Sequence, residues 1–432
     1  MKICMMTNTY LPHVGGVARS VSTFAEEYRR MGHEVLVVAP TFKGRPLAAK
    51  AEAMVERVPA IEKFNNSDFS VRLPLAAALS ERLDAFQADI IHAHHPFLLG
   101  DTALRVATNK NVPIVFTHHT RYEDYTHYMP MASEALNKVA KELPTHYANL
   151  CDGVIAPSQS LARMIRRRGV TVPISVIPTG IDVAAFASAE GAAFRKKAHI
   201  PSDALVIGHV GRLAKEKNLG YLADAVALFL EKDKNARFLV VGDGPEKVEL
   251  KEKFKARGLE DRLILAGKRT GRVLREAYRA MDIFAFASQS ETQGMVVAEA
   301  MAAGMPVVAL NASGVREVVR DEQNGFLLPA NAAPNTFANA LAKLAKSAEL
   351  RRTMSQAAQT TAGGFSREQC AAQVLAFYEE TRRATRRRRL FNDLHPWQAF
   401  VQRLGLEWDL LATRTSALAS VVFGESDAKQ AS

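Results

Sequence analysis

Cysteine is scarce in this sequence of 432 residues: only Cys4, Cys151 and Cys370 occur, and they lie far apart. No CxxC pair is present, and an odd number of cysteines fits a reducing compartment better than a disulfide framework. We therefore expect a cytoplasmic protein whose three thiols are buried and structural.

Long apolar runs are also missing, since no segment approaches the about 20 consecutive apolar residues that cross a bilayer. The N-terminal segment MKICMMTNTY has one lysine and a short apolar run, without the length or cleavage site of a signal peptide. It is predicted to form the first strand. Any membrane contact is therefore expected to be peripheral.

Two common ligand motifs are absent. The fingerprint GxGxxG does not occur, which argues against an NAD-dependent enzyme. No DxD-type pair stands in a suitable loop, so we predict neither a metal ion nor another cofactor.

The composition is that of a globular protein, with 48% hydrophobic and 23% charged residues, and the length favours two or three domains. Lys and Arg number 56 against 45 Asp and Glu, a net charge of +11. This surplus favours anionic partners: nucleotide diphosphates, nucleic acid or an acidic lipid surface. A soluble enzyme with a basic tail explains it equally. No module that interleaves basic and aromatic residues is recognisable, so we expect no nucleic-acid partner.

Short apolar runs alternate with helical patterns, which is typical of parallel sheets covered by helices on both faces. The predicted strands of the first half are residues 2–6, 34–39, 88–94, 112–119, 153–157 and 174–178. The segment near 178–186 is predicted to be a linker. After it, further strands are predicted at 205–211, 236–244, 262–267, 282–288, 306–310 and 325–329. We predict an α/β fold of two Rossmann-like, doubly wound domains, with the ligand site in a cleft between them.

The C-terminal region has a different pattern. Residues 365–380 read as a long helix with Ser366 as its N-cap, and a basic run follows at 382–390. A helical apolar stripe then contains Trp397, Phe400, Val401, Leu404, Trp408 and Leu411. The predicted domains are 1–180, 181–364, a closing helix at 365–381 and a basic amphipathic tail at 382–432.

Two segments at predicted strand ends suit a phosphate. Gly15 and Gly16 stand between the first strand and a helix, where glycine permits close approach of a ligand to a helix N-terminus. A structural tight turn is the alternative there. Arg212 and Lys217 in GRLAKEKN follow the strand at 205–211 and suit a diphosphate, unless they are solvated surface cations.

The string SQSETQGMVVAEAMAAGMPVVA (288–309) is the most informative. Glu291 precedes a helix that Gly294 opens, and Glu299 follows Glu291 by eight positions, a little over two helical turns. Glu299 can accept hydrogen bonds from vicinal hydroxyls such as those of a ribose. The backbone amides of Gln293 to Val296 are expected to lie at the N-terminus of this helix and to point, unpaired, at the same site.

In this order and spacing, GGVARSV, GRLAKEKN, VGDGP and ETQGMVVAEAMAAGMPVV resemble family 4 of the retaining glycosyltransferases with the GT-B fold, over residues 1 to about 380. The family often has an aromatic residue where Gln293 stands. ETQG, HAHHPFLLG (92–100) and THHTRYEDYTHY (117–128) resemble instead the branch that glycosylates diacylglycerol and related lipids.

The resemblance implies roles in binding a donor. Arg212 and Lys217 would neutralise its diphosphate, and Glu299 would hold the ribose. Glu291 and the amides near Gly294 would bind the transferred sugar; the predicted donor-binding residues are thus Gly15, Gly16, Gln293, Gly294, Met295, Val296 and Glu299. His119 matches the family histidine near the sugar, although His118 beside it is easily confused with it, and a strand-end structural role is the alternative.

The segment TRYEDYTHY is expected to contact the acceptor, through Tyr122, Glu123, Asp124 and Tyr125, or else to pack as a plain loop. The branch resemblance implies UDP-glucose as donor, a lipid such as diacylglycerol as acceptor, and a closing helix that returns to the N-terminal domain. The family is thought to react on one face through an oxocarbenium-like state, with a phosphate oxygen taking the acceptor proton.

Two basic stretches favour a peripheral position on the inner face of the cell membrane. SLARMIRRRGV (160–170) and the tail after the run 386–389 both combine arginines with an apolar face, as interfacial helices do. A tail that packs on the protein is the alternative. Rival functions are a soluble transferase acting on a carbohydrate or small metabolite, a nucleotide-sugar epimerase and a nucleic-acid binder.

Overall fold

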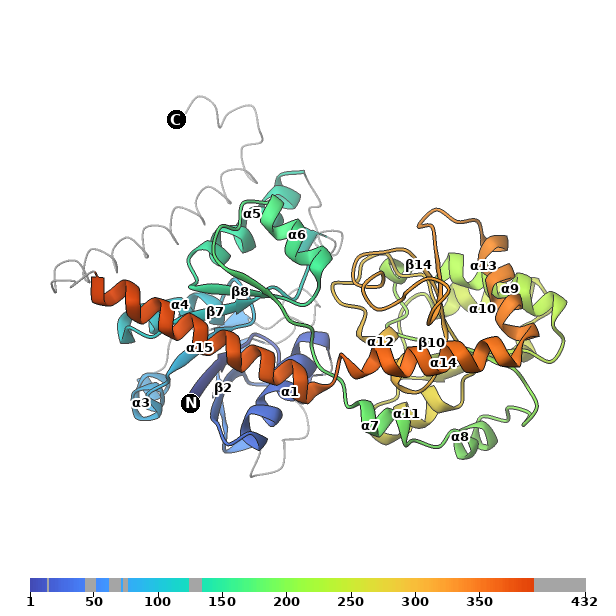
Figure 1. Cartoon of the computed structure of the whole chain (residues 1–432), viewed down its shortest axis with the longest axis horizontal. Coiled ribbons are helices and arrows are strands. Elements are labelled where there is room, and N and C mark those ends of the chain that lie inside the picture. The colour runs from blue at the N-terminus through green and yellow to red at the C-terminus, as the bar shows by residue number, and fades with distance from the viewer. Residues whose placement is uncertain (14, 43–51, 62–70, 73–76, 124–133, 392–432) are drawn as a thin grey trace. The chain divides into compact units, whose positions relative to one another are not determined.

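The computed structural model describes the chain except residues 14, 43–51, 62–70, 73–76, 124–133 and 392–432 (Figure 1). It divides into two compact units. Unit 1 comprises Met1–Gly180 together with the chain from Cys370 onward, and unit 2 comprises Ile181–Gln369.

Within the described residues, unit 1 is built on a seven-stranded parallel sheet of order β3-β2-β1-β6-β7-β8-β9. Its strands are β1 (Lys2–Met6), β2 (Glu34–Pro40), β3 (Val55–Val58), β6 (Ile90–Ala93), β7 (Ile114–Thr117), β8 (Gly153–Ala156) and β9 (Ile174–Val176). A separate antiparallel pair, β4 (Ala60–Ile61) with β5 (Val71–Arg72), was not predicted, nor was β3. The other strands lie where the apolar runs predicted them.

Helices cover both faces of this sheet because its strands are apolar on both sides. On one face, β-strand residues such as Cys4 and Phe116 pack beneath α3 (Ala77–Phe86), α4 (Leu99–Lys110), α5 (Glu134–Asn149) and α6 (Gln159–Arg167). On the other, Ile3 and Val115 pack beneath α1 (Gly16–Arg30) and α15 (Arg367–Phe391). Cys4, Cys151 and Cys370 are free and buried, as predicted.

Helix α15 is longer than the predicted closing helix, which was expected to end at residue 381. It continues to Phe391 because arginine is a good helix former, so the basic run extends the helix (Figure 1). Arg382 contacts the Asp89 carboxylate at 2.9 Å, and Thr385 donates to Asp152 at 3.0 Å. The helix is therefore an integral part of unit 1.

A series of buried, hydrogen-bonded polar side chains fixes α15 to the sheet. The Tyr378 hydroxyl is hydrogen-bonded to Nδ1 of His92, whose Nε2 lies 2.6 Å from the Thr117 hydroxyl, and all three side chains are buried. Tyr28 of α1 approaches the same hydroxyl at 3.5 Å. Buried polar atoms need such partners, so these bonds set how the helix lies on the sheet.

We expect Tyr378→Phe to lower the free energy of unfolding by about 1–2 kcal/mol, because His92 keeps a buried nitrogen that has lost its partner. Urea unfolding followed by circular dichroism measures the change. Tyr221→Phe is the matched control: its hydroxyl reaches the Ala333 carbonyl at 3.4 Å on the surface, and the expected change is below about 0.5 kcal/mol. Equal effects of the two substitutions would contradict the stabilising role of these buried hydrogen bonds.

Unit 2 contains, within the described chain, a six-stranded parallel sheet of order β12-β11-β10-β13-β14-β15. Its strands are β10 (Val206–Val210), β11 (Arg237–Val241), β12 (Leu263–Gly267), β13 (Ile283–Phe286), β14 (Val307–Leu310) and β15 (Gly325–Leu328). All six were predicted. The strand order reverses between β11-β10 and β13, so ligands are expected at the carboxyl ends of β10 and β13.

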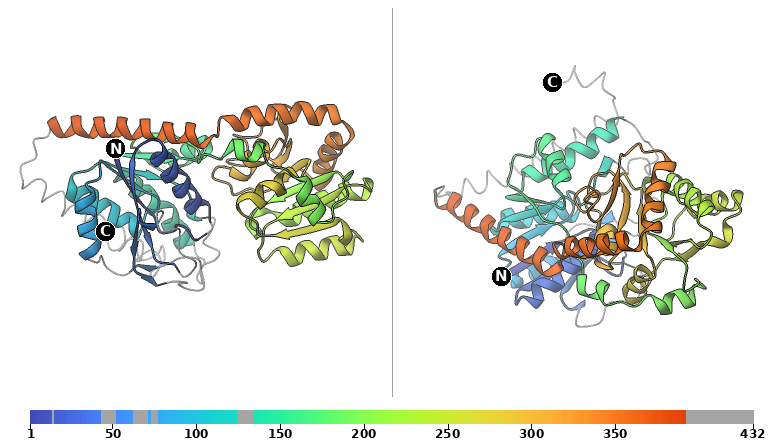
Figure 2. Two further views of the ribbon diagram at one scale, coloured as in Figure 1. Left: turned by 90° about the horizontal axis from the view of Figure 1, so that it is seen from below. Right: turned by 45° about the vertical axis from the view of Figure 1, so that its right-hand side comes forward.

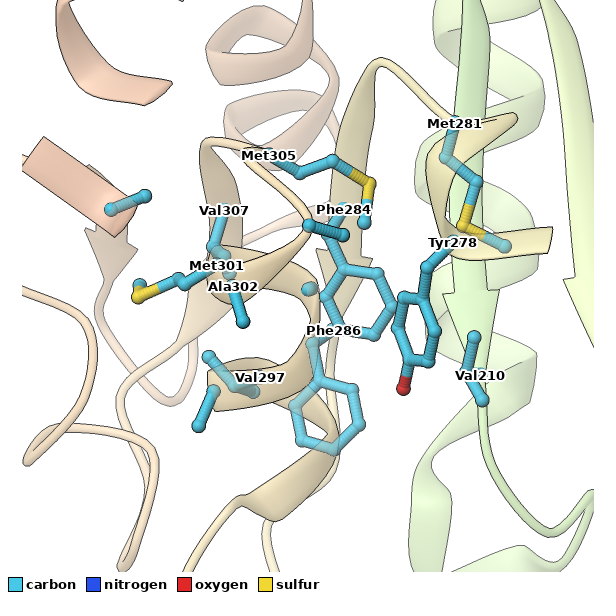
Figure 3. Packing of buried hydrophobic residues seen from close by; sticks show 14 of the residues in the cluster. Val210, Tyr278, Met281, Phe284, Phe286, Val297, Met301, Ala302, Met305 and Val307 are labelled. Carbon is cyan, nitrogen blue, oxygen red and sulfur yellow. The ribbon is translucent and has the colours of Figure 1, made fainter. Parts of the chain in front are cut away.

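The two faces of this sheet are covered by different sets of helices (Figure 2). One set is α9 (Leu219–Lys232), α10 (Lys247–Ala256) and α13 (Pro334–Lys346). The other is α7 (Val183–Ala187), α8 (Ala192–Lys197), α11 (Gly271–Arg279), α12 (Met295–Ala302) and α14 (Ala348–Gly363). Figure 3 shows the core beneath this second set of helices, in which the ring of Tyr278 lies beside that of Phe284, and the ring of Phe286 lies near Val297 of α12.

The predicted linker near 178–186 is partly structured. Ile181 pairs with Ser366, through a bond from the Ile181 amide to the Phe365 carbonyl at 2.8 Å, and α7 begins at Val183. Asp182 caps α7 and contacts Arg367 at 3.2 Å. The incoming and outgoing chains of unit 2 are thus tied together.

Helix α6 uses its apolar face inside unit 1. Leu161 and Ile165 are buried in the core, while Arg163, Arg166 and Arg167 are exposed. The expectation that this stretch offers an apolar face to a membrane is therefore wrong, and a cationic surface remains.

The stripe from Trp397 to Leu411 lies outside the described residues. No helix in the described part of the chain is long and apolar enough to cross a membrane.

Candidate active site

The loop after β10 is held by close backbone contacts with the loop after β11. The Gly211 amide donates to the Val241 carbonyl and the Leu213 amide to the Asp243 carbonyl, both at 3.0 Å. A Cβ on Gly242 would lie 1.8 Å from the Gly211 oxygen, so only glycine permits this approach. VGDGP therefore supports the chain that carries Arg212 and Lys217.

Lys217 and Glu291 form an ion pair at the carboxyl ends of β10 and β13. The lysine closes the short 3-10 helix η3 (Lys215–Lys217), and its Nζ lies 2.6 Å from Oε1 of Glu291. The side chains are only 17% and 16% exposed, so water screens the pair weakly. The sequence suggested separate roles for these residues, and the structure shows that they are direct partners.

Further hydrogen bonds join the two loops. The hydroxyl of Ser290 donates to the Glu216 carbonyl at 3.2 Å, and Nδ2 of Asn218 donates to the Ala287 carbonyl at 3.3 Å. Burial alone raises the pKa of the Glu291 carboxyl, but the Lys217 ammonium and the Ser288 hydroxyl more than offset this and bring that pKa below its ordinary value. Glu291 is therefore ionised at neutral pH.

Arg212 lies on the same loop, and its side chain is exposed. It stands five positions before Lys217, just after β10 ends at Val210. An exposed guanidinium and a half-buried ammonium on one loop provide two cations after the same strand, which suits an anion with several oxygens.

Helix α12 begins beside this pair. Gly294 is its N-cap, with φ of +73°, a left-handed conformation that favours glycine, and no side chain among the described residues caps the helix. Gln293 is buried, and Met295 and Val296 form the first turn. Helix α12 is eight residues long, and its N-terminus places partial positive charge next to Glu291.

Glu299 lies inside unit 2 rather than on its surface. It is fully buried on α12, and its Oε2 accepts a hydrogen bond from the Tyr278 hydroxyl at 2.8 Å. Figure 3 shows Tyr278 in the aromatic core from which that hydroxyl projects. The predicted contact of Glu299 with a ribose stays a prediction.

In unit 1, the glycine pair lies at the start of α1. Gly15 is the N-cap and Gly16 the first helical residue, with no acidic residue in the first turn. A Cβ on Gly16 would meet no atom within 4 Å among the described residues, whereas one on Gly15 would lie 3.0 Å from His13. Gly16 therefore faces open space, as a position that a ligand approaches would.

The two adjacent histidines after β7 differ in burial. His118 is 2% exposed, and its amide donates to the Ile155 carbonyl. His119 is half-buried, and its Nε2 lies 2.9 Å from Nδ1 of His94. His119 is thus the one of the two with a ring at the edge of the sheet.

The predicted acceptor segment is only partly described, since Asp124 and Tyr125 lie outside the described residues. The Tyr122 ring packs against Phe97, with centroids 5.6 Å apart. Glu123 accepts from Arg168 at 2.5 Å, which ties the loop to the end of α6. The ion pair of Glu123 with Arg168 is therefore a structural contact that the sequence pattern did not indicate.

Comparison with known proteins connects this geometry to a family. Residues 14–185 match the family described as Glycosyltransferase Family 4, and residues 192–361 match Glycosyl transferases group 1. The chain is 31% identical over 332 residues to an alpha-monoglucosyldiacylglycerol synthase of Streptococcus pneumoniae, covering 76% of this chain and 75% of that one. The chain belongs to glycosyltransferase family 4.

Other relatives of this glycosyltransferase differ in their named substrates. It is 27% identical to the alpha-monoglucosyldiacylglycerol synthase of Acholeplasma laidlawii, over 88% of this chain and 96% of that one. It is 29% identical to a GDP-mannose-dependent alpha-mannosyltransferase of Mycobacterium tuberculosis, over 88% and 97%. The resemblance to the diacylglycerol glucosyltransferase branch is supported.

Solved structures agree on the fold of the glycosyltransferase. Anabaena HepE in complex with UDP aligns with a TM-score of 0.69 at 23% identity, over 88% of this chain and 100% of that one. Sucrose-phosphate synthase from Thermosynechococcus elongatus aligns with a TM-score of 0.72 at 20% identity, over 88% and 99%. The predicted GT-B fold of two α/β domains is confirmed.

Sequence reasoning missed several polar residues of the glycosyltransferase. His209, inside β10, is fully buried; its Nδ1 donates to the Ala285 carbonyl at 3.2 Å, and burial lowers its pKa to about 4. Tyr278 supports Glu299, and His94 contacts His119. His209 and Tyr278 lie within apolar patterns and gave no separate signal. Among the described residues, no group of three or more His, Cys, Asp or Glu side chains could hold a metal ion.

Proposed function

We propose that this glycosyltransferase transfers glucose from UDP-glucose, with retention of anomeric configuration, to a lipid acceptor such as diacylglycerol. The observation that carries the proposal is the Lys217–Glu291 pair beside the start of α12, at the point where the strand order of unit 2 reverses. The names of two relatives, both alpha-monoglucosyldiacylglycerol synthases, supply the sugar and the acceptor.

In this proposal, unit 2 binds the donor. Lys217 and the exposed Arg212 neutralise the diphosphate, which carries the charge that the broken bond leaves behind. Glu291 accepts hydrogen bonds from sugar hydroxyls, and it keeps the Lys217 ammonium in one position before the donor arrives. The amides of Gln293 to Val296 add donors at the start of α12. Glu299 holds the ribose hydroxyls.

Unit 1 contributes the remaining groups. The first turn of α1 at Gly15 and Gly16 admits the phosphates and the sugar without steric obstruction from a side chain at Gly16. His119 contacts the sugar, and the segment of Tyr122, Glu123, Asp124 and Tyr125 contacts the acceptor. Because Glu123 is paired with Arg168, it acts by holding this segment in place.

The proposed reaction needs no nucleophile from the protein. The bond between the anomeric carbon and the diphosphate oxygen breaks, and the acceptor hydroxyl attacks from the same face. A phosphate oxygen of the leaving group takes the hydroxyl proton. Catalysis then consists of positioning and charge stabilisation by fixed cations, so no metal ion is proposed.

A donor and acceptor screen tests the proposal. Purified protein is incubated with UDP-glucose, UDP-galactose or GDP-mannose and with diacylglycerol, a lipid extract or soluble polyols, and products are identified by mass spectrometry. The coupling of the anomeric proton in the NMR spectrum of the product reports retention. Glucosyldiacylglycerol of α configuration, formed equally with EDTA present, is the expected product. A mannosylated or water-soluble product would replace the donor or acceptor assignment, and nucleotide-sugar epimerisation without acceptor would contradict transfer.

We also propose that the enzyme works on an anionic membrane surface. Exposed arginines of α6 and of α15, namely Arg163, Arg166, Arg167, Arg383, Arg386 and Arg387, support this proposal. In vesicle flotation, we expect the full chain to float with vesicles containing phosphatidylglycerol, and less with pure phosphatidylcholine. A truncation after Phe391 retains all of α15 and separates the contribution of the tail. Equal flotation with both lipids would contradict an electrostatic attachment.

A further inference from the structure

Two histidines from neighbouring strands meet at the carboxyl edge of the unit 1 sheet. His94 directly follows β6, and His119 follows β7. Nδ1 of His94 lies 2.9 Å from Nε2 of His119, and the rings are 23° from parallel with centroids 5.2 Å apart. This is an N–H···N hydrogen bond, so one of the two nitrogens carries the proton and the other accepts it.

Neither ring is charged at neutral pH. Burial lowers the pKa of both imidazoles well below the ordinary value, and neighbouring histidines lower it further. His94 is fully buried. The pair therefore holds one proton on each ring, and only two arrangements of these protons are compatible with the hydrogen bond.

The far nitrogen of His94 distinguishes the two arrangements. Its Nε2 is buried and has no hydrogen-bond partner among the residues that the structure describes. If His119 donated to His94, this Nε2 would carry a buried N–H group without an acceptor, which is rare in proteins. If His94 donates through Nδ1, its Nε2 is only an unused acceptor, which costs less.

We infer that His94 is a positioning residue that fixes the proton of His119 on Nδ1, so that His119 donates a hydrogen bond to a substrate oxygen. This inference rests on the glycosyl transfer proposed above. It assigns the buried His94 a part in that reaction through its contact with His119. A sugar hydroxyl or phosphate oxygen accepts such a bond, whereas the opposite tautomer of His119 would present a lone pair and repel a phosphate.

The groups that face the pair are themselves histidines. His92 and His95 act on both rings, and His118 acts on His119. Nδ1 of His95 accepts a hydrogen bond from the backbone N–H of Asn8, and burial lowers the pKa of His95 to about 3. Glu123 and Arg168 act on His118, whose pKa burial lowers to about 4. The neighbouring histidines are thus neutral from pH 6 to 8 and do not titrate in that range.

Two nearly isosteric substitutions separate tautomer control from packing. His94→Asn retains a donor close to the place of Nδ1, and we expect kcat/KM within about tenfold of the wild type. His94→Asp offers only an acceptor, so His119 must donate through Nε2 and loses the proton on Nδ1. A missing preorganised donor lowers kcat/KM about 100-fold at pH 8.

The pH profile gives the Asp variant a signature that a structural defect would not produce. A carboxylate beside His119 raises its pKa, and the imidazolium that forms as pH falls carries protons on both nitrogens. Activity of His94→Asp relative to wild type should therefore rise from pH 8 to pH 6, while that of His94→Asn stays level. Equal activities of the Asn and Asp variants, or a flat ratio for Asp, would overturn the inference.

A spectroscopic measurement on the unmodified chain decides the matter even if the Asp variant does not fold. In ¹⁵N-labelled protein, two-bond proton–nitrogen correlations show which ring nitrogen of each histidine is protonated, and loss of one signal set in His119→Gln identifies His119. Protonation at Nδ1 supports the inference, and protonation at Nε2 overturns it. This result does not depend on transfer activity, so failure of the proposed function would be recognised separately, by a wild-type protein without product.

Discussion

Lys217→Ala should lower kcat/KM for the nucleotide-sugar donor by about 10²–10³-fold, which corresponds to about 2–4 kcal/mol of transition-state stabilisation. The ammonium is only 17% exposed and already held by Glu291 at 2.6 Å, so it does not have to be ordered when the diphosphate leaves. Its removal also leaves the Glu291 carboxylate, which is only 16% exposed, without its partner. Initial rates at saturating acceptor measure the effect.

Lys215→Ala is the matched control. Lys215 lies in the same turn of η3, but its side chain is exposed. The substitution removes the same charge from the same loop, and we expect less than a threefold change because water screens that charge. Comparable losses in the two variants would show that Lys217 acts only through general electrostatic attraction.

Gly242→Ala should destabilise the protein by about 3 kcal/mol and weaken donor binding at the same time. The added Cβ would lie 1.8 Å from the Gly211 carbonyl oxygen, and a backbone atom cannot rotate out of the way. The loop after β10 would have to move, and that loop contains Arg212 and Lys217. Urea unfolding and the KM for the donor report the two effects.

Gly258→Ala separates this collision from backbone strain. Gly258 has a φ of +66°, so alanine is strained there, yet its Cβ would meet no atom within 4 Å among the described residues. We expect a loss of about 1 kcal/mol with an unchanged KM for the donor. If Gly242→Ala were no worse than this control, the close contact between the two loops would not position the cations.

The framework of both sheets was predictable because each central strand is a short, continuous apolar run. Those runs are buried on both faces, and helices with their own periodicity separate them. Strand β3 was not predicted, since Val55–Val58 contains two charged residues at the edge of the sheet. Helix α15 continues past the predicted end at residue 381, since the charge of the arginine run predicts a solvated tail whereas arginine also favours helix.

The pairings within the site were not predictable to the same degree. Lys217 and Glu291 are 74 positions apart, and only the order of strands in the sheet brings β10 and β13 together. The contact of His94 with His119 likewise depends on β6 lying next to β7. Burial of Glu299 against Tyr278 has no sequence signal, because a helical pattern alone does not reveal the partner of a charged side chain.

The central claim is that Lys217 of unit 2, held in place by Glu291, receives the diphosphate of the donor. Isothermal titration of UDP and GDP into the purified protein tests it without any acceptor or membrane. We predict binding of one of these nucleotides to the wild type, at least tenfold weaker binding to Lys217→Ala, and unchanged binding to Lys215→Ala. Equal affinity of the wild type and Lys217→Ala for the preferred nucleotide would contradict the claim.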